Sequence, residues 1–301
     1  MQKIFDEVNS LDKRCYEKFA LSEDILMEHA ASSMYDFIES KFEENKSILI
    51  VCGSGNNGAD GIALARLLHK KYDVNLYFAK EPKSTMAKIQ LQRAKSLDIK
   101  IVKEIFEGDI IVDCLFGSGL NKQLDTNDTS LLESLNSFNS YKIACDIPSG
   151  IDTLGQVKTI AFEAETTITM GALKTSLFSD IAKDYVGEIV VAYLGVQREV
   201  YEIETNKYLL DESDMKLPFR NKKNAHKGTY GHLNVYVGDK KGAGIISSKA
   251  AFGFGAGLVS VVCHEKLDLP YHIMQTQNIS ENCTAIAIGM GLGKYETNEI
   301  K

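Results

Sequence analysis

The sequence predicts an α/β fold built on a doubly wound parallel sheet. Short apolar runs alternate with helix-length segments over roughly the first two thirds of the chain, as parallel strands and their crossover helices do. Runs such as residues 48–52 and 110–114 are continuously apolar, which is typical of strands buried on both faces. We therefore expect a three-layer, Rossmann-like domain whose ligand crevice lies beyond the carboxyl ends of its strands.

The elements of this domain can be placed in order along the chain. An amphipathic helix is expected over residues 22–42, because its apolar residues recur on one face and Ser22 is followed by two acidic residues, a typical helix start. Strands are expected at residues 48–52, 74–78, 110–114, 143–147, 166–170 and 189–194. The residues that follow these strands are the first place to look for a site.

A second segment follows a polar connector. Residues 201–223 are charged, contain Pro218 and lack a long apolar run, so we place the domain boundary near residue 210 and expect domains at 1–210 and 211–301. Beyond it we expect a strand at 232–238, a helix at 242–254 and strands at 258–262 and 284–289. The sequence ends soon after the glycine-rich end of this last strand, which leaves the predicted sheet with few neighbouring strands. Either the rest of this domain is missing, or the segment packs against the first domain.

Composition and charge narrow the classes of function. The apolar fraction is 44% and the charged fraction 25%, as in ordinary globular proteins. A formal net charge of −7 disfavours non-specific binding to nucleic acid or anionic membrane. No window is apolar enough for a membrane span, and residues 1–18 are too charged for a signal peptide. We expect a cytoplasmic protein.

The six cysteines are scattered and form no CxxC pair. Three of them end apolar, strand-like runs, so we interpret all six as reduced core thiols, with a catalytic thiol as the alternative. They are Cys15, Cys52, Cys114, Cys145, Cys263 and Cys283.

A glycine-rich segment, GSGNNGADG at residues 53–61, lies between a predicted strand and a predicted helix. Its glycines permit tight turns and close approach of a ligand, and the N–H groups at the helix start attract phosphate. It is neither GxGxxG nor a Walker motif, and Asn56, Asn57 and Asp60 add side chains that a pure phosphate loop does not need. We expect it to bind a nucleotide-like small molecule; the alternative is an Asn-Gly turn with a helix N-cap.

Two further strand ends carry an acid. Asp113 ends one strand before a loop that contains Gly117, and Asp146 ends another before the rigid turn that leads to Ser149. Loops that follow neighbouring parallel strands should converge, and their oxygen atoms suit a hard cation. The alternative for Asp113 is a helix cap or a loop anchor. Lys174 is expected to be a solvated lysine rather than the partner of a ligand anion.

These motifs in combination resemble the NAD(P)H-hydrate epimerase family. The matching stretches are LMEHAA in the first helix, GSGNNGADG, IIVDCLFGSGL and ACDIPSGID, which together cover about residues 1–200. Ala59 departs from the family, which usually has glycine there. The resemblance implies a metabolite-repair isomerase that interconverts the R and S epimers of nicotinamide cofactors hydrated at ring carbon 6. It also implies a homo-oligomer.

The resemblance further implies roles for particular residues. Asp146 would contact substrate as the acid–base residue, and a potassium ion would be held by Asn57, Asp113 and Ser149. The hydrated cofactor would be bound by Asn56, Asn57, Gly58, Ala59, Asp60, Gly117, Ser118, Gly119, Leu120, Asn121, Lys122, Gln123 and Asp146.

The segment that begins HKGTYGHLNVYVG at His226 resembles the opening part of the ADP-dependent NAD(P)H-hydrate dehydratase, a ribokinase-like family. That family grips its nucleotide with a later GTGD motif, which this sequence lacks. We therefore expect an incomplete ribokinase-like α/β segment without dehydratase activity, and ADP or ATP as a cofactor only if that domain were complete. His226, Lys227, Ala243 and residues 289–293 are either remnants of substrate contacts or packing positions.

Two other functions remain open. A non-catalytic nucleotide- or RNA-binding module is suggested by basic residues in and after the connector, whose alternative is a solvated linker. These residues are Lys216, Arg220, Lys222, Lys223 and Lys227. A sugar or cofactor kinase is the third possibility, because of the ribokinase-like opening.

Overall fold

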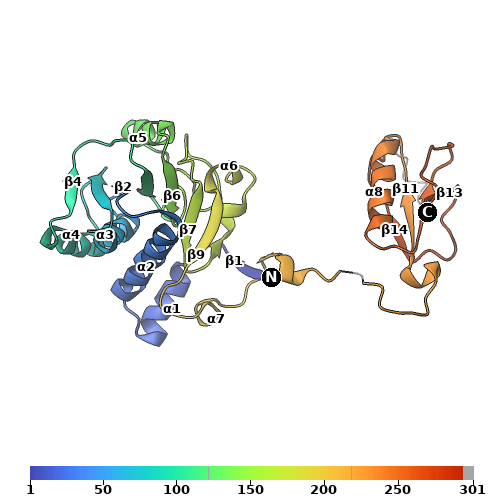
Figure 1. Cartoon of the computed structure of the whole chain (residues 1–301), viewed down its shortest axis with the longest axis horizontal. Coiled ribbons are helices and arrows are strands. Elements are labelled where there is room, and N and C mark those ends of the chain that lie inside the picture. The colour runs from blue at the N-terminus through green and yellow to red at the C-terminus, as the bar shows by residue number, and fades with distance from the viewer. Residues whose placement is uncertain (121, 218, 294–301) are drawn as a thin grey trace. The chain divides into compact units, whose positions relative to one another are not determined.

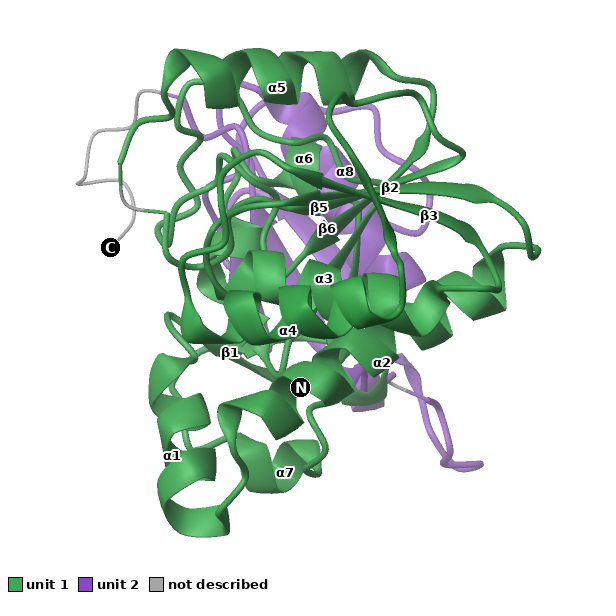
Figure 2. Ribbon diagram, turned by 90° about the vertical axis from the view of Figure 1, so that its left-hand side faces the viewer, with its two compact units in different colours: residues 1–214 green, residues 215–301 purple. Residues whose placement is uncertain are grey.

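The structure, a computed structural model, describes residues 1–120, 122–217 and 219–293. The chain divides into two compact units, residues 1–214 and 215–301 (Figure 2). The division falls four residues after position 210, where the composition of the connector suggested it. Over the described residues, no helix combines the length and apolar character that crossing a membrane requires.

The first unit is built on a seven-stranded sheet in which all neighbouring strands are parallel. Its order, β4-β3-β2-β5-β6-β7-β9, runs outward in both directions from β2 and β5. The doubly wound fold is therefore confirmed, and its switch point lies between these two strands. The strands are β2 (Ser47–Cys52), β3 (Asp73–Phe78), β4 (Lys100–Val102), β5 (Ile110–Cys114), β6 (Tyr141–Cys145), β7 (Thr166–Met170) and β9 (Glu188–Ala192).

Successive side chains of each central strand enter two different cores. Ile48 and Ile50 of β2 pack with α2 (Glu23–Lys41), α3 (Asn56–Leu68) and α4 (Thr85–Ser96). Leu49 and Val51 face the other way and pack with α5 (Thr126–Ser137). Figure 1 shows α5 across the strands from α3 and α4. This two-sided burial explains why the strands read as continuous apolar runs.

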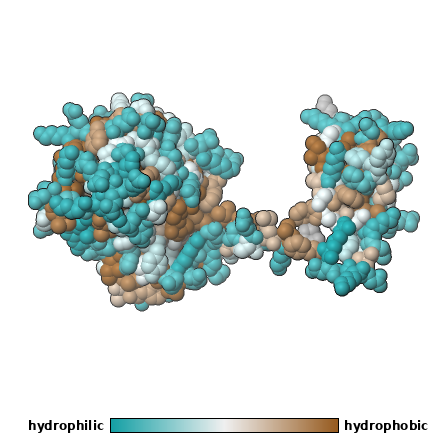
Figure 3. All heavy atoms as spheres, viewed as in Figure 1, coloured by the Kyte–Doolittle hydropathy of each residue, from teal (hydrophilic) through white to brown (hydrophobic). Residues whose placement is uncertain are grey.

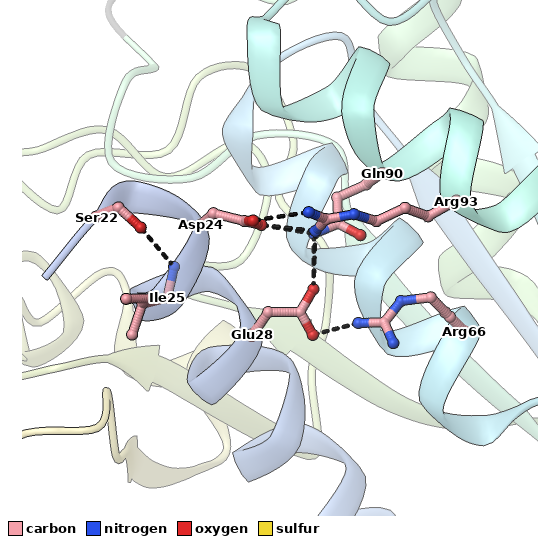
Figure 4. A network of polar contacts seen from close by, with 7 residues as sticks. All are labelled: Ser22, Asp24, Ile25, Glu28, Arg66, Gln90 and Arg93. Atoms are coloured by element: carbon pink, nitrogen blue, oxygen red, sulfur yellow. Dashed lines mark hydrogen bonds and ion pairs between the residues drawn. The ribbon is translucent and has the colours of Figure 1, made fainter.

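A network of charged side chains joins the three helices on one face of the sheet (Figure 4). Arg93 of α4 donates two hydrogen bonds to Asp24 of α2, at 2.6 and 2.7 Å, and a third to Glu28 at 3.1 Å. Arg66 of α3 also pairs with Glu28. The predicted helix start at Ser22 is confirmed, since its hydroxyl accepts the Ile25 N–H at 3.3 Å. The network ties the first half of α2 to α4 and to the last turn of α3.

A smaller, three-stranded sheet of order β10-β1-β8 was not predicted. It comprises β1 (Gln2–Phe5), β8 (Leu173–Lys174) and β10 (Tyr208–Leu209). The parallel pairing of β1 with β8 sets Phe5 opposite Lys174, so the start of the chain is tied to the segment after β7. Short elements complete the unit: α1 (Asn9–Phe19), η1 (Thr175–Phe178), α6 (Lys183–Val186), α7 (Arg198–Tyr201) and η2 (Glu212–Asp214).

The second unit contains a four-stranded parallel sheet of order β13-β12-β11-β14. Its core includes Val235, Val259 and Val261. Other large apolar side chains, such as Ile246 and Phe254, are exposed. Brown spheres in Figure 3 show hydrophobic residues at the surface of this unit, as they do on the first unit. Among the described elements of this unit, β13 and the short helix η3 were not predicted. The elements are η3 (Lys227–Tyr230), β11 (His232–Tyr236), α8 (Lys241–Gly253), β12 (Leu258–Val262), β13 (Met274–Thr276) and β14 (Ala285–Ala287).

All six cysteines are free thiols. The prediction of core thiols is confirmed for Cys15, Cys52, Cys114 and Cys145, which are buried. It is wrong for Cys263 and Cys283, which are only partly buried. Burial raises the pKa of the Cys114 thiol to about 11, so that thiol is protonated at neutral pH and a poor nucleophile.

Candidate active-site cleft

A cleft of about 580 Å³ opens in the first unit where the loops after β2, β5 and β6 meet. This is the switch point of the sheet, where ligands of doubly wound proteins bind. The cleft is lined by Val8, Asn9, Asp12, Ser54, Gly55, Asn56, Asn57, Asp60, Ser84, Leu115, Phe116, Gly117, Ser118, Gly119, Leu120, Asp146 and Met170.

The glycine-rich loop is shorter than predicted, because α3 already begins at Asn56 and only residues 53–55 form a loop. The first hydrogen bond within α3 runs from the Ala59 N–H to the Gly55 carbonyl at 3.1 Å, and no side chain caps this helix. The N–H groups before Ala59 therefore have no helical acceptor and suit an anion.

The two later glycines of this motif serve packing and not turns, which corrects their predicted role. A Cβ on Gly58 would lie 2.1 Å from the Gly53 carbonyl oxygen. A Cβ on Gly61 would lie 2.7 Å from the sulfur of Cys114. Both glycines let α3 approach the loop and the sheet closely, which holds the helix N-terminus at the cleft.

The backbone at Gly117 and Ser118 lies close to two polar side chains, those of Asn57 and Asp146. A Cβ on Gly117 would lie 3.1 Å from Asn57 Oδ1 and 3.1 Å from Asp146 Oδ2. The Ser118 N–H donates a hydrogen bond to Asp146 Oδ2 at 3.2 Å. Asn57 Nδ2 is buried and has no hydrogen-bond partner within the described residues. This buried amide N–H donor is therefore available to form a hydrogen bond with a ligand.

Asp146 has an unusual backbone conformation and a basic partner. Its φ of 71° is left-handed, a conformation that Asp tolerates better than most residues and that occurs often at active sites. The side chain is 10% exposed, and its Oδ1 accepts the Met170 N–H at 3.2 Å. Lys174 Nζ lies 2.7 Å from the same oxygen. Asp146 is therefore a carboxyl group with an ammonium partner at the edge of a cleft.

The prediction of a solvated Lys174 is wrong. Its side chain is 2% exposed, and besides Asp146 its ammonium contacts Thr169 Oγ1 at 2.8 Å and the Met170 carbonyl at 3.0 Å. The three donors of the ammonium are thus matched by three oxygen acceptors. The short strand β8, paired with β1, positions this lysine.

Asp113 and Ser149 lie behind the cleft lining and are fully buried. Asp113 accepts the Ser149 N–H and hydroxyl, each at 2.7 Å, and the Leu115 N–H at 3.0 Å. The Ser149 hydroxyl oxygen also accepts the Phe116 N–H at 2.9 Å. The aspartate therefore anchors the loops after β5 and β6 to each other. Burial raises the pKa of Asp113 to about 6.

The structure adds Asp12 to the cleft, a residue that the motifs did not indicate. It lies on α1, and Oδ1 accepts the hydroxyl of buried Tyr201 at 2.7 Å. Asp60 lies on α3 and lines the same cleft. Burial raises the pKa of both carboxyls, and for Asp60 the nearby Asp146 and Asp12 add to the effect. Apolar Leu11 and Cys15, four residues apart, were the available sign of a helix here.

Several predicted substrate residues do not line the cleft. Gly58 and Ala59 are buried within α3, and Lys122 and Gln123 are exposed. Gln123 Oε1 accepts the Thr159 hydroxyl at 3.2 Å. The predicted residue Asn121 lies outside the described residues.

The second unit has a cavity of its own, about 250 Å³, after β11 and β12. It is lined by Tyr236, Val237, Gly238, Asp239, Lys241, Val262, Cys263, His264 and Glu265. The proposed remnants His226 and Lys227 are exposed and lie outside this lining, as does Ala243. The basic residues of the connector are also exposed, and Arg220 lies over the Tyr230 ring at 4.7 Å. In the described part of the chain, no three His, Cys, Asp or Glu residues are grouped to hold a metal ion.

Comparison with known proteins places these features in a family. Residues 23–176 match the family described as YjeF-related protein N-terminus. The bifunctional NAD(P)H-hydrate repair enzyme Nnr of Helicobacter pylori is 43% identical over 97% of this chain and 65% of its own length. The NAD(P)H-hydrate epimerase of Leuconostoc citreum is 33% identical over 64% of this chain and 89% of its own length.

The crystal structure of the yeast protein YNL200c shares the fold, with a TM-score of 0.56 and 17% identity, and the match covers 69% of this chain and 96% of that one. The present chain spans 55% of the length of a second bifunctional repair enzyme, from Dictyoglomus turgidum, at 36% identity. It thus covers less than two thirds of these bifunctional relatives. By the family match and the epimerase relative together, the chain belongs to the family of YjeF-related protein N-terminal domains.

Proposed function

We propose that the first unit is an NAD(P)H-hydrate epimerase, which interconverts the two configurations at the hydrated ring carbon of NADH or NADPH. The observation that carries the proposal is the Asp146 carboxylate, paired with buried Lys174 at the edge of a cleft that also receives a helix N-terminus. Relatives named as epimerase or as bifunctional repair enzyme support the same activity. The cleft combines an anion site with a proton acceptor.

The chemistry requires proton transfer at the hydroxyl group. The hydrated carbon carries a hydroxyl beside a ring nitrogen, so its configuration is lost when either the C–O or the C–N bond breaks and re-forms. Asp146 can accept or return the hydroxyl proton because its carboxylate lies at the cleft surface. Lys174 pairs with that carboxylate, and the Ser118 N–H and Met170 N–H fix its orientation.

The first turn of α3 is suited to the phosphates of the dinucleotide. Its unpaired N–H groups and the helix dipole favour a negative charge at Asn56 and Asn57. Asn56 Nδ2 donates to Glu23 of α2 at 2.5 Å, which holds that side chain at the rim. Because backbone groups do the binding, the substitution of glycine by Ala59 within the helix is compatible with this role.

A potassium ion held by Asn57, Asp113 and Ser149 is part of the proposal. These residues offer amide, carboxylate and hydroxyl oxygens, the donor set of a hard cation. Asp113 is fully buried, and no described Lys or Arg forms an ion pair with it. A cation there would compensate a buried negative charge and keep the two anchored loops in place.

The test follows the two epimers of hydrated NADH by chromatography with the purified chain, in potassium and in tetramethylammonium chloride. We expect a sample enriched in one epimer to reach equilibrium far faster than without protein, and faster in potassium. A rate equal to the uncatalysed one, at protein concentrations that saturate binding, would contradict the proposal.

The expected lack of dehydratase activity in residues 211–301 stays a prediction. It is tested by adding ADP or ATP and measuring recovery of NADH absorbance from the hydrate, with an active dehydratase as positive control. Nucleotide-dependent recovery by this chain would show the prediction to be wrong. The same preparation, titrated with RNA over a salt series, tests the alternative of an RNA-binding module, for which we expect no steep salt slope.

A further inference from the structure

The cleft presents a carboxyl group, that of Asp12, which the proposed chemistry has not used. Asp12 on α1 lines the cleft together with Asp60 and Asp146. It also lines a smaller adjoining cavity of about 100 Å³ next to Met170. The three carboxyls come from different elements, so the fold brings them to one space.

Tyr201 fixes the position of Asp12. The Tyr201 side chain is 1% exposed and its hydroxyl donates to Asp12 Oδ1 at 2.7 Å. Gly171 makes room for the ring, because a Cβ there would lie 2.7 Å from the Tyr201 hydroxyl oxygen. Within the described residues, Asp12 Oδ2 accepts no hydrogen bond. One oxygen of the carboxyl is therefore held and the other is available in the cleft.

Burial favours the protonated form of Asp12, and charged groups from four elements surround it. It faces Lys174 of β8, Asp146 after β6, Glu23 of α2 and Asp60 of α3. Lys174 is the cation among these groups, and it is paired with Asp146. Burial raises the pKa of Asp12, and the nearby carboxylates add to the effect; the Tyr201 hydrogen bond and Lys174 act in the opposite direction.

The cleft thus holds two carboxyl groups with different partners. Asp146 has an ammonium partner and serves as the proton acceptor. Asp12 has only a hydroxyl partner and keeps its proton to higher pH than an ordinary aspartate. Environments that separate two carboxyl groups in this way assign one as base and the other as acid.

We propose that Asp12, positioned by Tyr201, is the catalytic acid that complements Asp146, an inference that rests on the proposed epimerase function. If the C–N bond breaks, Asp146 takes the hydroxyl proton, the oxygen forms a carbonyl, and the Asp12 proton goes to the ring nitrogen that receives the bond's electron pair. If the C–O bond breaks, the Asp12 proton goes to the hydroxyl oxygen, water leaves with that bond's electron pair, and the nitrogen lone pair forms the iminium. Addition from the other face returns each proton.

The test compares Asp12→Asn, Asp60→Asn and Tyr201→Phe with Glu17→Gln, an exposed acid on the same helix. We expect Asp12→Asn to lower kcat about 10²- to 10⁴-fold, the usual contribution of an acid–base group, with Kd for NADH hydrate within about threefold. Glu17→Gln should keep all of kcat, and Asp60→Asn should lose less of it than Asp12→Asn does. Circular dichroism verifies that each variant is folded.

The pH profile gives a readout that a merely structural role does not change. Loss of the Asp12 proton should produce the alkaline limb of the kcat profile. The Tyr201 hydroxyl stabilises the charged carboxylate of Asp12, so Tyr201→Phe should move that limb to higher pH. This measurement decides the question even if Asp12→Asn fails to fold.

Three outcomes are distinguishable. Wild-type protein without epimerase activity removes the proposed function itself. An active wild type with a near-normal Asp12→Asn, or with an unshifted limb in Tyr201→Phe, overturns only the role of Asp12. If Asp60→Asn, and not Asp12→Asn, loses kcat and the alkaline limb, the proton donor is Asp60 and the inference is wrong.

Discussion

The two sides of the cleft are built in different ways. The strand-end side consists of residues 53–60, 115–120 and Asp146, each directly after a buried strand of one sheet. The N-terminal side consists of Asp12, which lines the cleft, and of Lys174 and Tyr201, which support it from outside the lining; these residues depend on the pairing of β1 with β8 and on contacts across nearly 190 residues of chain. Local motifs therefore specify one half of the site, and tertiary contacts specify the other.

The largest effect is expected at Asp146, where the two sides meet. Asp146→Asn removes the proton acceptor but keeps the shape, and Asn also tolerates the φ of 71°. We expect a loss of about 10²- to 10⁴-fold in kcat with substrate binding retained. Epimer exchange and a separate binding titration measure the two quantities. Near-normal turnover in this variant would remove Asp146 from the chemistry.

Lys174 tests whether the N-terminal side supports the strand-end side. Lys174→Met leaves Asp146 without its ammonium partner, and breaking a buried pair in this way typically costs about 3–5 kcal/mol of unfolding free energy. The control is Lys183→Met, whose pair with Asp180 is exposed and should contribute less than about 1 kcal/mol. Urea unfolding compares the two.

A double variant separates charge from packing at the same place. Lys174→Met with Asp146→Asn removes both members of the pair, so the penalty of the unpaired carboxylate should disappear and part of the lost stability should return. Equal losses of unfolding free energy in Lys174→Met and Lys183→Met would instead support the prediction that Lys174 is solvated.

These expectations show which features a sequence can reveal. The glycine motif, Asp113 and Asp146 follow apolar runs, and that local order was enough to predict a doubly wound sheet with a crevice at its strand ends. Lys174 follows a strand as well, but its burial depends on β1 pairing beside it, which no local pattern shows. Asp12 was missed because a charged N-terminal stretch hid a short helix with few apolar residues.

The glycines of the motif show a second limit. Gly55 and Gly58 look alike in the sequence, yet a Cβ on Gly55 would have no neighbour within 4 Å, whereas one on Gly58 would lie 2.1 Å from a carbonyl oxygen. Alanine at a helical position gains up to about 1 kcal/mol in propensity, but a clash with backbone typically costs about 1–3 kcal/mol. We expect Gly58→Ala to destabilise the protein and Gly55→Ala to change its unfolding free energy by less than about 0.5 kcal/mol.

The measurement is again urea unfolding, with anion binding as a second readout. Gly58→Ala should also weaken binding of the dinucleotide, because the start of α3 must move away from Gly53. Equal stability of the two variants would mean that the close approach of α3 to the loop is not required.

The smallest expected effect concerns the ion behind the strand-end side. Burial raises the pKa of Asp113 from 3.8 to about 6, so the folded protein binds this proton more tightly than the unfolded chain does. Without a cation, stability should therefore fall as pH rises through this range, because ionisation leaves a buried charge unpaired. Potassium binds the ionised form and should restore stability, by about 1.4 kcal/mol at ten times its Kd. The rise in Tm caused by potassium, relative to tetramethylammonium at equal ionic strength, should be near zero at pH 5 and largest above pH 7.

Asp113→Asn should abolish this pH dependence, while Asp109→Asn, at an exposed aspartate that pairs with Lys46, should preserve it. A potassium effect of equal size at both pH values, or one that persists in Asp113→Asn, would place the ion elsewhere.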